Sequence, residues 1–149
     1  MVEKLIRKQE RPVEVYDTKD FEFKCKDGTK ALYTGELMYR KKHGHGTCKY
    51  INGVYEGQYK NDKIHGIGTF KFESKDFYYG EWIDEKRTGR GTYIFNDGTV
   101  HEGLWNENKA NGRGIRKYSD GSVYNGEWKY DLKHGHGTFK YYDGNFYDG

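Results

Sequence analysis

Hydrophobic and polar residues alternate along short runs of the chain, and glycine-rich segments separate these runs. Tyr124, Gly126 and Trp128 occupy every second position of one run, and Phe139 and Tyr141 do the same in the next. Residues at every second position share one face of a β-strand. A glycine-rich segment joins the two runs, and an Asp-Gly pair closes the second. This pattern predicts a β-hairpin that is followed by a tight turn.

The same hairpin recurs along the chain with a nearly constant period. The glycine that opens each unit follows its predecessor by 22 residues in the first interval (57 − 35) and by 23 in the later ones (80 − 57, 103 − 80, 126 − 103 and 149 − 126). A second and a third glycine follow 9 and 11 residues after it (44 − 35 and 46 − 35). A fixed period in this range indicates a one-dimensional repeat array, in which each unit packs only on its neighbours.

Aligning the units places large side chains in three columns, which we expect to lie on one face of a sheet. The first-strand column consists of Leu37, Tyr59, Trp82, Trp105 and Trp128. The second-strand columns consist of Cys48, Phe70, Tyr93, Arg116 and Phe139, and of Tyr50, Phe72, Phe95, Tyr118 and Tyr141. The alternation does not decide whether this face is the concave one of a curved sheet or is packed in another way.

The repeated unit resembles the MORN repeat (membrane occupation and recognition nexus). The third unit carries the resemblance most clearly, with Tyr-Tyr-Gly-Glu-Trp at residues 78–82, Gly-Arg-Gly-Thr-Tyr at residues 89–93 and Asp-Gly at residues 97–98. The resemblance extends over residues 33–149, which is most of the chain. It implies an all-β fold, namely an elongated single-layer antiparallel sheet of stacked MORN β-hairpins that is twisted and curved into a trough.

The period also predicts how the chain is divided. We expect an N-terminal arm or cap at residues 1–20 and a MORN-repeat array at residues 21–149. A half-repeat at 21–30 opens the array, and the full repeats follow at 33–54, 55–77, 78–100, 101–123 and 124–146. Two strands of about 5–6 residues for each repeat, with one cap strand, form the predicted sheet.

Composition fits a thin sheet better than a thick aliphatic core. Hydrophobic residues make up 34% of the chain, whereas aromatic residues reach 17%. The net charge of +3, from 26 basic and 23 acidic residues, is too balanced to indicate a nucleic-acid partner, and we expect none. No long apolar run, secretory leader or myristoylation signal is recognisable, so we expect an intracellular protein of the cytoplasm or cytoskeleton, with the cilium as one candidate location.

Candidate chemistry in the chain is sparse. Cys25 and Cys48 occupy the same column of successive units, about 9–10 Å apart for two strands, which is too far for a disulfide. His43, His65 and His134 align, but other units place Thr88 and Asn111 in their column, which argues against a metal ladder. The Gly-x-Gly segments open no helix and so form no phosphate loop. We therefore predict no enzyme activity, no metal site and no cofactor.

Two sets of residues are candidates for binding. The aromatic face, which we predict to bind partner segments, consists of Tyr59, Trp82, Trp105, Trp128, Phe70, Tyr93 and Phe139. The basic edge, which we place at the turns within the repeats, consists of Lys41, Lys42, Lys63, Lys86, Arg87, Lys109 and Lys133. Asp97, Asp120 and Asp143 lie at the opposite turns. An acidic partner or an anionic phospholipid surface would suit the basic edge.

The function that we expect is a non-catalytic protein-interaction scaffold. The resemblance implies a structural component of a ciliary, axonemal or other cytoskeletal assembly, because MORN repeats occur in such proteins. Two alternatives stay open: peripheral binding of anionic membranes through the basic edge, and service as the accessory array of a larger enzyme. The segment at 147–149 opens a further unit, and we expect an open sheet edge there that favours end-to-end self-association.

Overall fold

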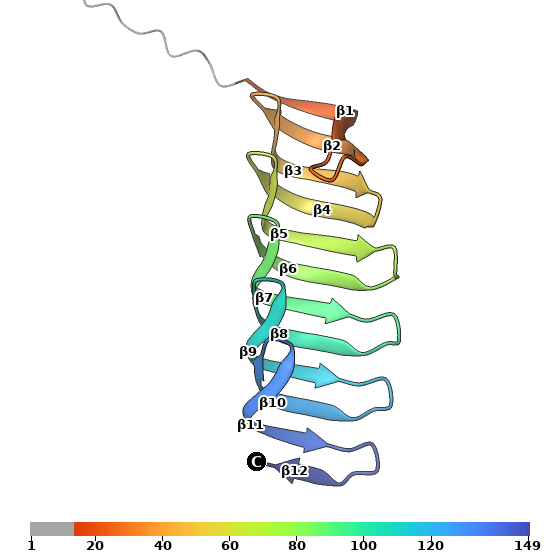
Figure 1. The fold of residues 1–149 in the computed structure, drawn as a ribbon, viewed down its shortest axis with the longest axis vertical. Coiled ribbons are helices and arrows are strands. Elements are labelled where there is room, and N and C mark those ends of the chain that lie inside the picture. The colour runs from red at the N-terminus through yellow and green to blue at the C-terminus, as the bar shows by residue number, and fades with distance from the viewer. Residues whose placement is uncertain (1–13) are drawn as a thin grey trace, which may run out of the picture.

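The computed structural model describes residues 14–149 and contains a single antiparallel sheet in which twelve strands lie side by side in chain order (Figure 1). The strands are β1 (Val15–Lys24), β2 (Lys30–Met38), β3 (Lys41–Tyr50), β4 (Gly53–Lys60), β5 (Lys63–Phe72), β6 (Phe77–Ile83), β7 (Lys86–Ile94), β8 (Val100–Asn106), β9 (Lys109–Lys117), β10 (Val123–Lys129), β11 (Leu132–Lys140) and β12 (Phe146–Asp148). The predicted fold class is confirmed. No helix of membrane-spanning length and apolarity occurs within residues 14–149.

The strands differ from the prediction in length and number. Strands β2–β11 have 7–10 residues instead of 5–6, because pairing continues through the glycine-rich segments. The segment before the first full repeat forms one strand, β1, with an irregularity between Thr18 and Phe21. The boundary expected between residues 20 and 21 therefore falls inside a strand, and residues 1–13 of the expected arm lie outside the described part. Phe146–Asp148 adds the twelfth strand by pairing with β11.

Two kinds of turn connect the strands. Within each repeat, two residues with positive φ form the turn, as Asp84 (47°) and Glu85 (71°) do between β6 and β7. This backbone matches the twist of a tight hairpin. Between repeats, the side chain of Asp97 accepts a hydrogen bond from the Thr99 N–H (2.8 Å), and Gly98 adopts a φ of 90°. Lys75 (φ 71°) takes this position in the second repeat, which lacks the Asp-Gly pair.

The turns within successive repeats are also linked to one another. The N–H of Asp62 donates to the carbonyl of Lys42 (2.9 Å), while the Asp62 carboxylate accepts from the Lys42 N–H (2.8 Å). Asn108 makes the same pair of bonds with Arg87, and Asp131 makes it with Ala110. An Asp or Asn at the second turn position thus ties one hairpin to the preceding one.

Paired glycines explain the first and third glycine ladders. Gly80 lies opposite Gly91 across β6 and β7, and a Cβ on Gly80 would lie 2.6 Å from the Gly91 Cα. The Tyr78 ring crosses this pair, and its hydroxyl donates to the Glu81 carbonyl (3.2 Å). Only glycine leaves room for the tyrosine and for the close backbone approach.

A methyl group at such a position should destabilise its repeat. We expect Gly80→Ala to lower the free energy of unfolding by about 1–3 kcal/mol, because backbone atoms have to move apart. Gly98→Asn is the matched control, since no atom lies within 4 Å of a Cβ there and Asn tolerates positive φ. Chemical denaturation of both variants measures the difference, and equal stabilities would contradict the close-packing explanation.

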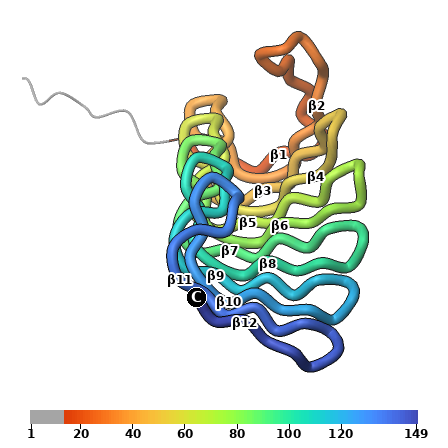
Figure 2. The backbone as a smooth tube through the Cα atoms, turned by 60° about the horizontal axis from the view of Figure 1, so that its bottom comes forward, coloured from red at the N-terminus to blue at the C-terminus, as the bar shows by residue number. Residues whose placement is uncertain are grey.

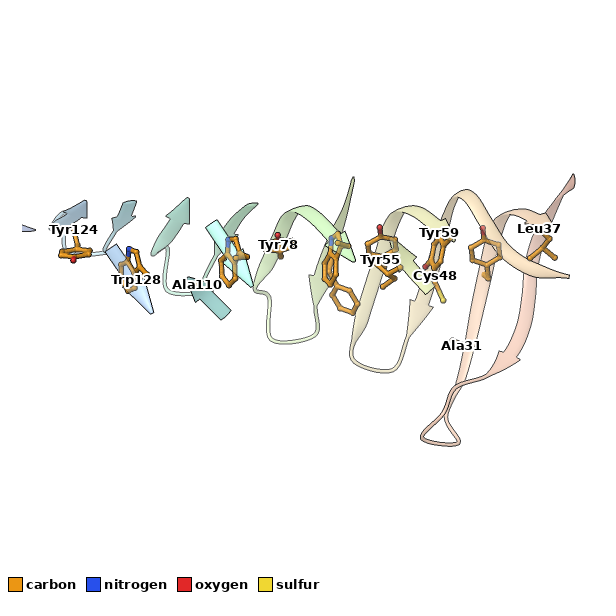
Figure 3. Close-up of a cluster of buried hydrophobic side chains, with 14 residues drawn as sticks. Ala31, Leu37, Cys48, Tyr55, Tyr59, Tyr78, Ala110, Tyr124 and Trp128 are labelled. Atoms are coloured by element: carbon orange, nitrogen blue, oxygen red, sulfur yellow. The ribbon is translucent and has the colours of Figure 1, made fainter. Parts of the chain in front are cut away.

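Aromatic rings form a continuous column along the sheet (Figure 3). Successive rings meet edge to face, with centroids 4.8–5.6 Å apart and planes 81–89° apart. The order along the column is Tyr33, Tyr59, Tyr55, Trp82, Tyr78, Trp105, His101, Trp128 and Tyr124. Each tryptophan N–H also donates to a glycine carbonyl of the preceding repeat, as Trp105 does to Gly91 (3.1 Å).

Trp105 is buried, with 5% of its surface exposed, although the tryptophans of neighbouring repeats are not its direct ring neighbours. It does not pack directly between Trp82 and Trp128, because Tyr78 and His101 lie between the tryptophans. The first residue of each repeat, two positions before the glycine, therefore contributes a ring to the aromatic column.

The sheet is curved across its strands into a U-shaped trough, seen obliquely from one end in Figure 2. Phe23, Leu37 and Tyr50 line a cavity together with Asp27 and Arg40, which belong to turns at opposite ends of the strands. The aromatic side of the sheet is therefore the concave side, which answers the question that the sequence left open.

Candidate partner-binding trough

Most residues of the predicted aromatic face serve the core. Tyr59, Trp82, Trp105, Trp128 and Phe70 expose between 3% and 7% of their surface. Tyr93 and Phe139 are partly buried and pack against this core. The structure thus brings all seven residues to the inner face, but only Tyr93 and Phe139 retain surface that a partner could contact.

A different column is accessible along the trough. We use the term aromatic strip for the second column of the second strands, which consists of Tyr50, Phe72, Phe95, Tyr118 and Tyr141. The first four side chains are half-buried, and Tyr141 is 46% exposed. Rings of the strip pack against rings of the neighbouring column. The ring centroids are 4.6 Å apart for Phe95 and Tyr93, and 5.8 Å apart for Tyr118 and Phe139.

The sequence-based choice of site residues omitted the aromatic strip, although the sequence contained a usable signal. The strip is aromatic in all five repeats, whereas the adjacent column contains Cys48 and Arg116. A column that stays aromatic although it is less buried than its neighbours is a better candidate for contact with a partner.

Cations alternate with aromatic rings inside the trough. Lys42, Arg87 and Lys133, predicted as part of the basic edge, point to the inner face, as does Arg116. The Lys42 ammonium lies 3.7 Å from the centre of the Phe23 ring, and the Arg116 guanidinium lies 4.1 Å from that of Trp128. Burial lowers the pKa of Lys42, Arg87 and Arg116 below their ordinary values.

The remaining cations of the predicted basic edge form a separate, exposed column at the first position of the second strands. They are Lys41, Lys63, Lys86 and Lys109. Lys63 faces Asp84 (3.7 Å), and Lys86 pairs with Glu107 of the next repeat. Because acidic turn residues alternate with these lysines, the edge has mixed charge and is not uniformly basic.

The residue that follows the opening glycine has a structural role in the first three repeats. The side-chain oxygens of Glu36, Gln58 and Glu81 accept the N–H groups of His45, Ile67 and Arg90. These bonds satisfy backbone N–H groups beside the bulges of the first three hairpins. Within the described residues, no group of three or more His, Cys, Asp or Glu side chains lies close enough to hold a metal ion. Cys25 and Cys48 are free thiols.

His101 is an exception in the aromatic column. It occupies the position of Tyr33, Tyr55, Tyr78 and Tyr124, is fully buried, and neither ring nitrogen has a hydrogen-bond partner. Desolvation, aided by the charge of Arg116, lowers the pKa of His101 to about 4. An imidazole is shorter than a phenol and cannot reach the carbonyl that the tyrosine hydroxyls bond.

Comparison with known proteins identifies the repeat. The profile of the MORN repeat matches residues 33–54, 55–77, 78–100, 101–123 and 124–146, which together make up more than half of the chain. The chain belongs to the MORN repeat family. MORN repeats generally act as non-catalytic modules that bind proteins or membranes, which agrees with a trough that offers aromatic and cationic surface.

A comparison with solved structures also found a similar chain. This is the TCP domain of SAS-4 (dCPAP) in complex with a proline-rich motif of Ana2 (dSTIL) of Drosophila melanogaster. The sequence identity is 12%, the alignment covers 87% of this chain and 88% of that chain, and the TM-score is 0.38. A search among curated protein sequences found no match.

Proposed function

We propose that this MORN array is a non-catalytic scaffold that holds a segment of a partner protein in its trough, within a ciliary or other cytoskeletal assembly. The observation that carries the proposal is the aromatic strip, which runs through every repeat and stays partly accessible. Aromatic side chains supply large contact area at low entropic cost and are enriched where proteins bind one another.

The cations in the trough favour an amphipathic partner with acidic side chains. Arg87, Arg116 and Lys133 flank the aromatic strip, and no ion pair forms at any of them within residues 14–149. A partner that covers the rings with apolar groups and pairs these cations with carboxylates would complement both features. The ciliary setting rests on the use of MORN repeats in axonemal proteins.

The test is affinity capture from an extract of ciliated cells. The wild-type chain is expected to recover axonemal or cytoskeletal proteins, and Phe95→Asp with Tyr118→Asp should lose them because charge enters the strip. Tyr79→Asp is the matched control, since Tyr79 is 53% exposed on the outer face. Recovery of no such protein, or equal recovery by all variants, would contradict the proposal.

Membrane binding is the second candidate, favoured by the exposed column of Lys41, Lys63, Lys86 and Lys109. Flotation with phosphatidylserine vesicles at low and physiological salt tests it. Binding through this column should weaken as salt rises and when these lysines become alanine. The accessory role in a larger enzyme and the end-to-end self-association stay predictions.

A further inference from the structure

A cavity of about 740 Å³ lies at the N-terminal end of the trough. Its floor is apolar and includes Phe21, Phe23 and Leu37. One wall is the β1–β2 turn, which stands up at the end of the sheet in Figure 2, and the opposite wall includes Arg40 and Glu85 from the turns within the repeats. The cavity is large enough for side chains of a bound peptide.

Lys42 is an unpaired cation in the lining of this cavity. Only 6% of its surface is exposed, and three rings surround its ammonium at 3.7 Å (Phe23), 5.4 Å (Tyr59) and 5.8 Å (Tyr50). Its backbone N–H bonds Asp62, but its ammonium has neither an ion pair nor a hydrogen bond among residues 14–149. A buried ammonium without an oxygen acceptor gains more from a carboxylate than an exposed lysine does.

The carboxylates that line the cavity already have partners. Asp27 accepts two hydrogen bonds from Thr29, at 2.9 and 2.6 Å, and Asp62 accepts the Lys42 N–H. Glu85 pairs with Lys26 across the cavity at 3.6 Å. Lys24 and Arg40, like the Lys42 ammonium, have no ion pair in the part of the chain that the structure describes. Four cations (Lys24, Lys26, Arg40 and Lys42) and three carboxylates (Asp27, Asp62 and Glu85) line the cavity, so its net charge is +1 (4 − 3) above an apolar floor.

We propose that this cavity binds a peptide segment of a partner protein in which a carboxylate side chain neighbours an apolar one. The carboxylate accepts hydrogen bonds from the Lys42 ammonium, and the apolar side chain covers Phe21 and Phe23, which are partly exposed. The proposal rests on the proposed scaffold function and specifies the chemistry of the partner at one end of the trough. The Lys26–Glu85 pair is exposed and can separate to admit the peptide at little cost.

The experiment selects binders from a phage-displayed library of random peptides on the full chain and measures their affinities as synthetic peptides by fluorescence polarisation. Selected peptides should be enriched in Asp or Glu next to Leu, Phe or Trp. Lys42→Met should weaken their binding by about tenfold or more, whereas Lys42→Arg should retain it because the charge remains. Lys49→Met is the matched control, since Lys49 is exposed on the outer face of the same strand.

A second pair of variants leaves the buried residues intact. Ile51 is 71% exposed and lines the cavity, so its replacement should not disturb folding. Ile51→Glu should weaken the binding of the selected peptides, because its carboxylate repels theirs, and Ile51→Lys should not weaken it.

Peptides without acidic enrichment, or peptides unaffected by Lys42→Met and Ile51→Glu, would overturn the cavity proposal while leaving the scaffold function intact. Phosphatidylserine vesicles that bind through Lys42 when no acidic peptide is selected would also overturn it. If the wild-type chain captured no partner protein from the extract of ciliated cells, that result would instead refute the scaffold function.

Discussion

Trp105→Ala should lower the free energy of unfolding by about 3–5 kcal/mol, the range for removal of a fully packed tryptophan. The side chain is 5% exposed, meets Tyr78 and His101 edge to face, and donates to the Gly91 carbonyl (3.1 Å). The Arg87 guanidinium, 4.9 Å from its ring, would lose a cation–π contact as well. Hydrogen exchange of the backbone amides measures both the size and the location of the loss.

The loss should remain local, because strands contact only their neighbours in this sheet. Protection should fall in β6–β9 and stay near the wild-type level in β2–β4. Ile83→Ala is the matched control, since Ile83 is 52% exposed and its loss should cost less than about 0.5 kcal/mol. Uniform loss of protection along all repeats would contradict a structure held by neighbour contacts.

Acidification should destabilise the fourth repeat through His101. Its pKa is about 4 in the folded protein, against an ordinary value of 6.5, so the unfolded chain binds the proton more readily between these values. The stability contributed by the neutral imidazole is thus complete above pH 6.5 and declines as the pH falls towards 4. The shift corresponds to a total loss of about 3 kcal/mol.

His101→Tyr isolates this effect. The tyrosine restores the hydroxyl that bonds a carbonyl in other repeats, so we expect about 1 kcal/mol of added stability at pH 7. Denaturation of both proteins between pH 4 and pH 7 should show a difference that widens as the pH falls. His136→Ala is the control because His136 is exposed on the outer face. Parallel pH profiles for the wild type and His101→Tyr would show that His101 does not titrate as proposed.

The fold could be predicted from the sequence because the period places the same residue types in every unit. Glycines at fixed offsets marked the hairpins, and alternation of large side chains marked one face. The strand lengths could not be predicted, because glycine-rich segments are usually read as turns. In this protein Gly80 and Gly91 pair within the ladder to make room for Tyr78.

The site was harder to predict than the fold. Lys41 and Lys42 are adjacent in sequence, but the alternation of side chains along the strand places Lys41 in solvent and Lys42 in the trough. Counting all the turn cations as one surface therefore overestimated the positive charge of the edge. The sequence shows that the aromatic strip is aromatic in every repeat, but only the packing of the rings shows that this column stays partly accessible while its neighbours are buried. The bonds between Asp62 and Lys42 join residues of two repeats and have no signal within a single unit.

The most direct test of the account is site-specific photo-crosslinking with p-benzoylphenylalanine in an extract of ciliated cells. One chain carries the probe in place of Phe95 in the aromatic strip, and the other carries it in place of Tyr79 on the outer face. We predict a crosslinked partner protein from position 95 and none from position 79. A partner crosslinked from position 79 alone would contradict the assignment of the trough as the binding surface.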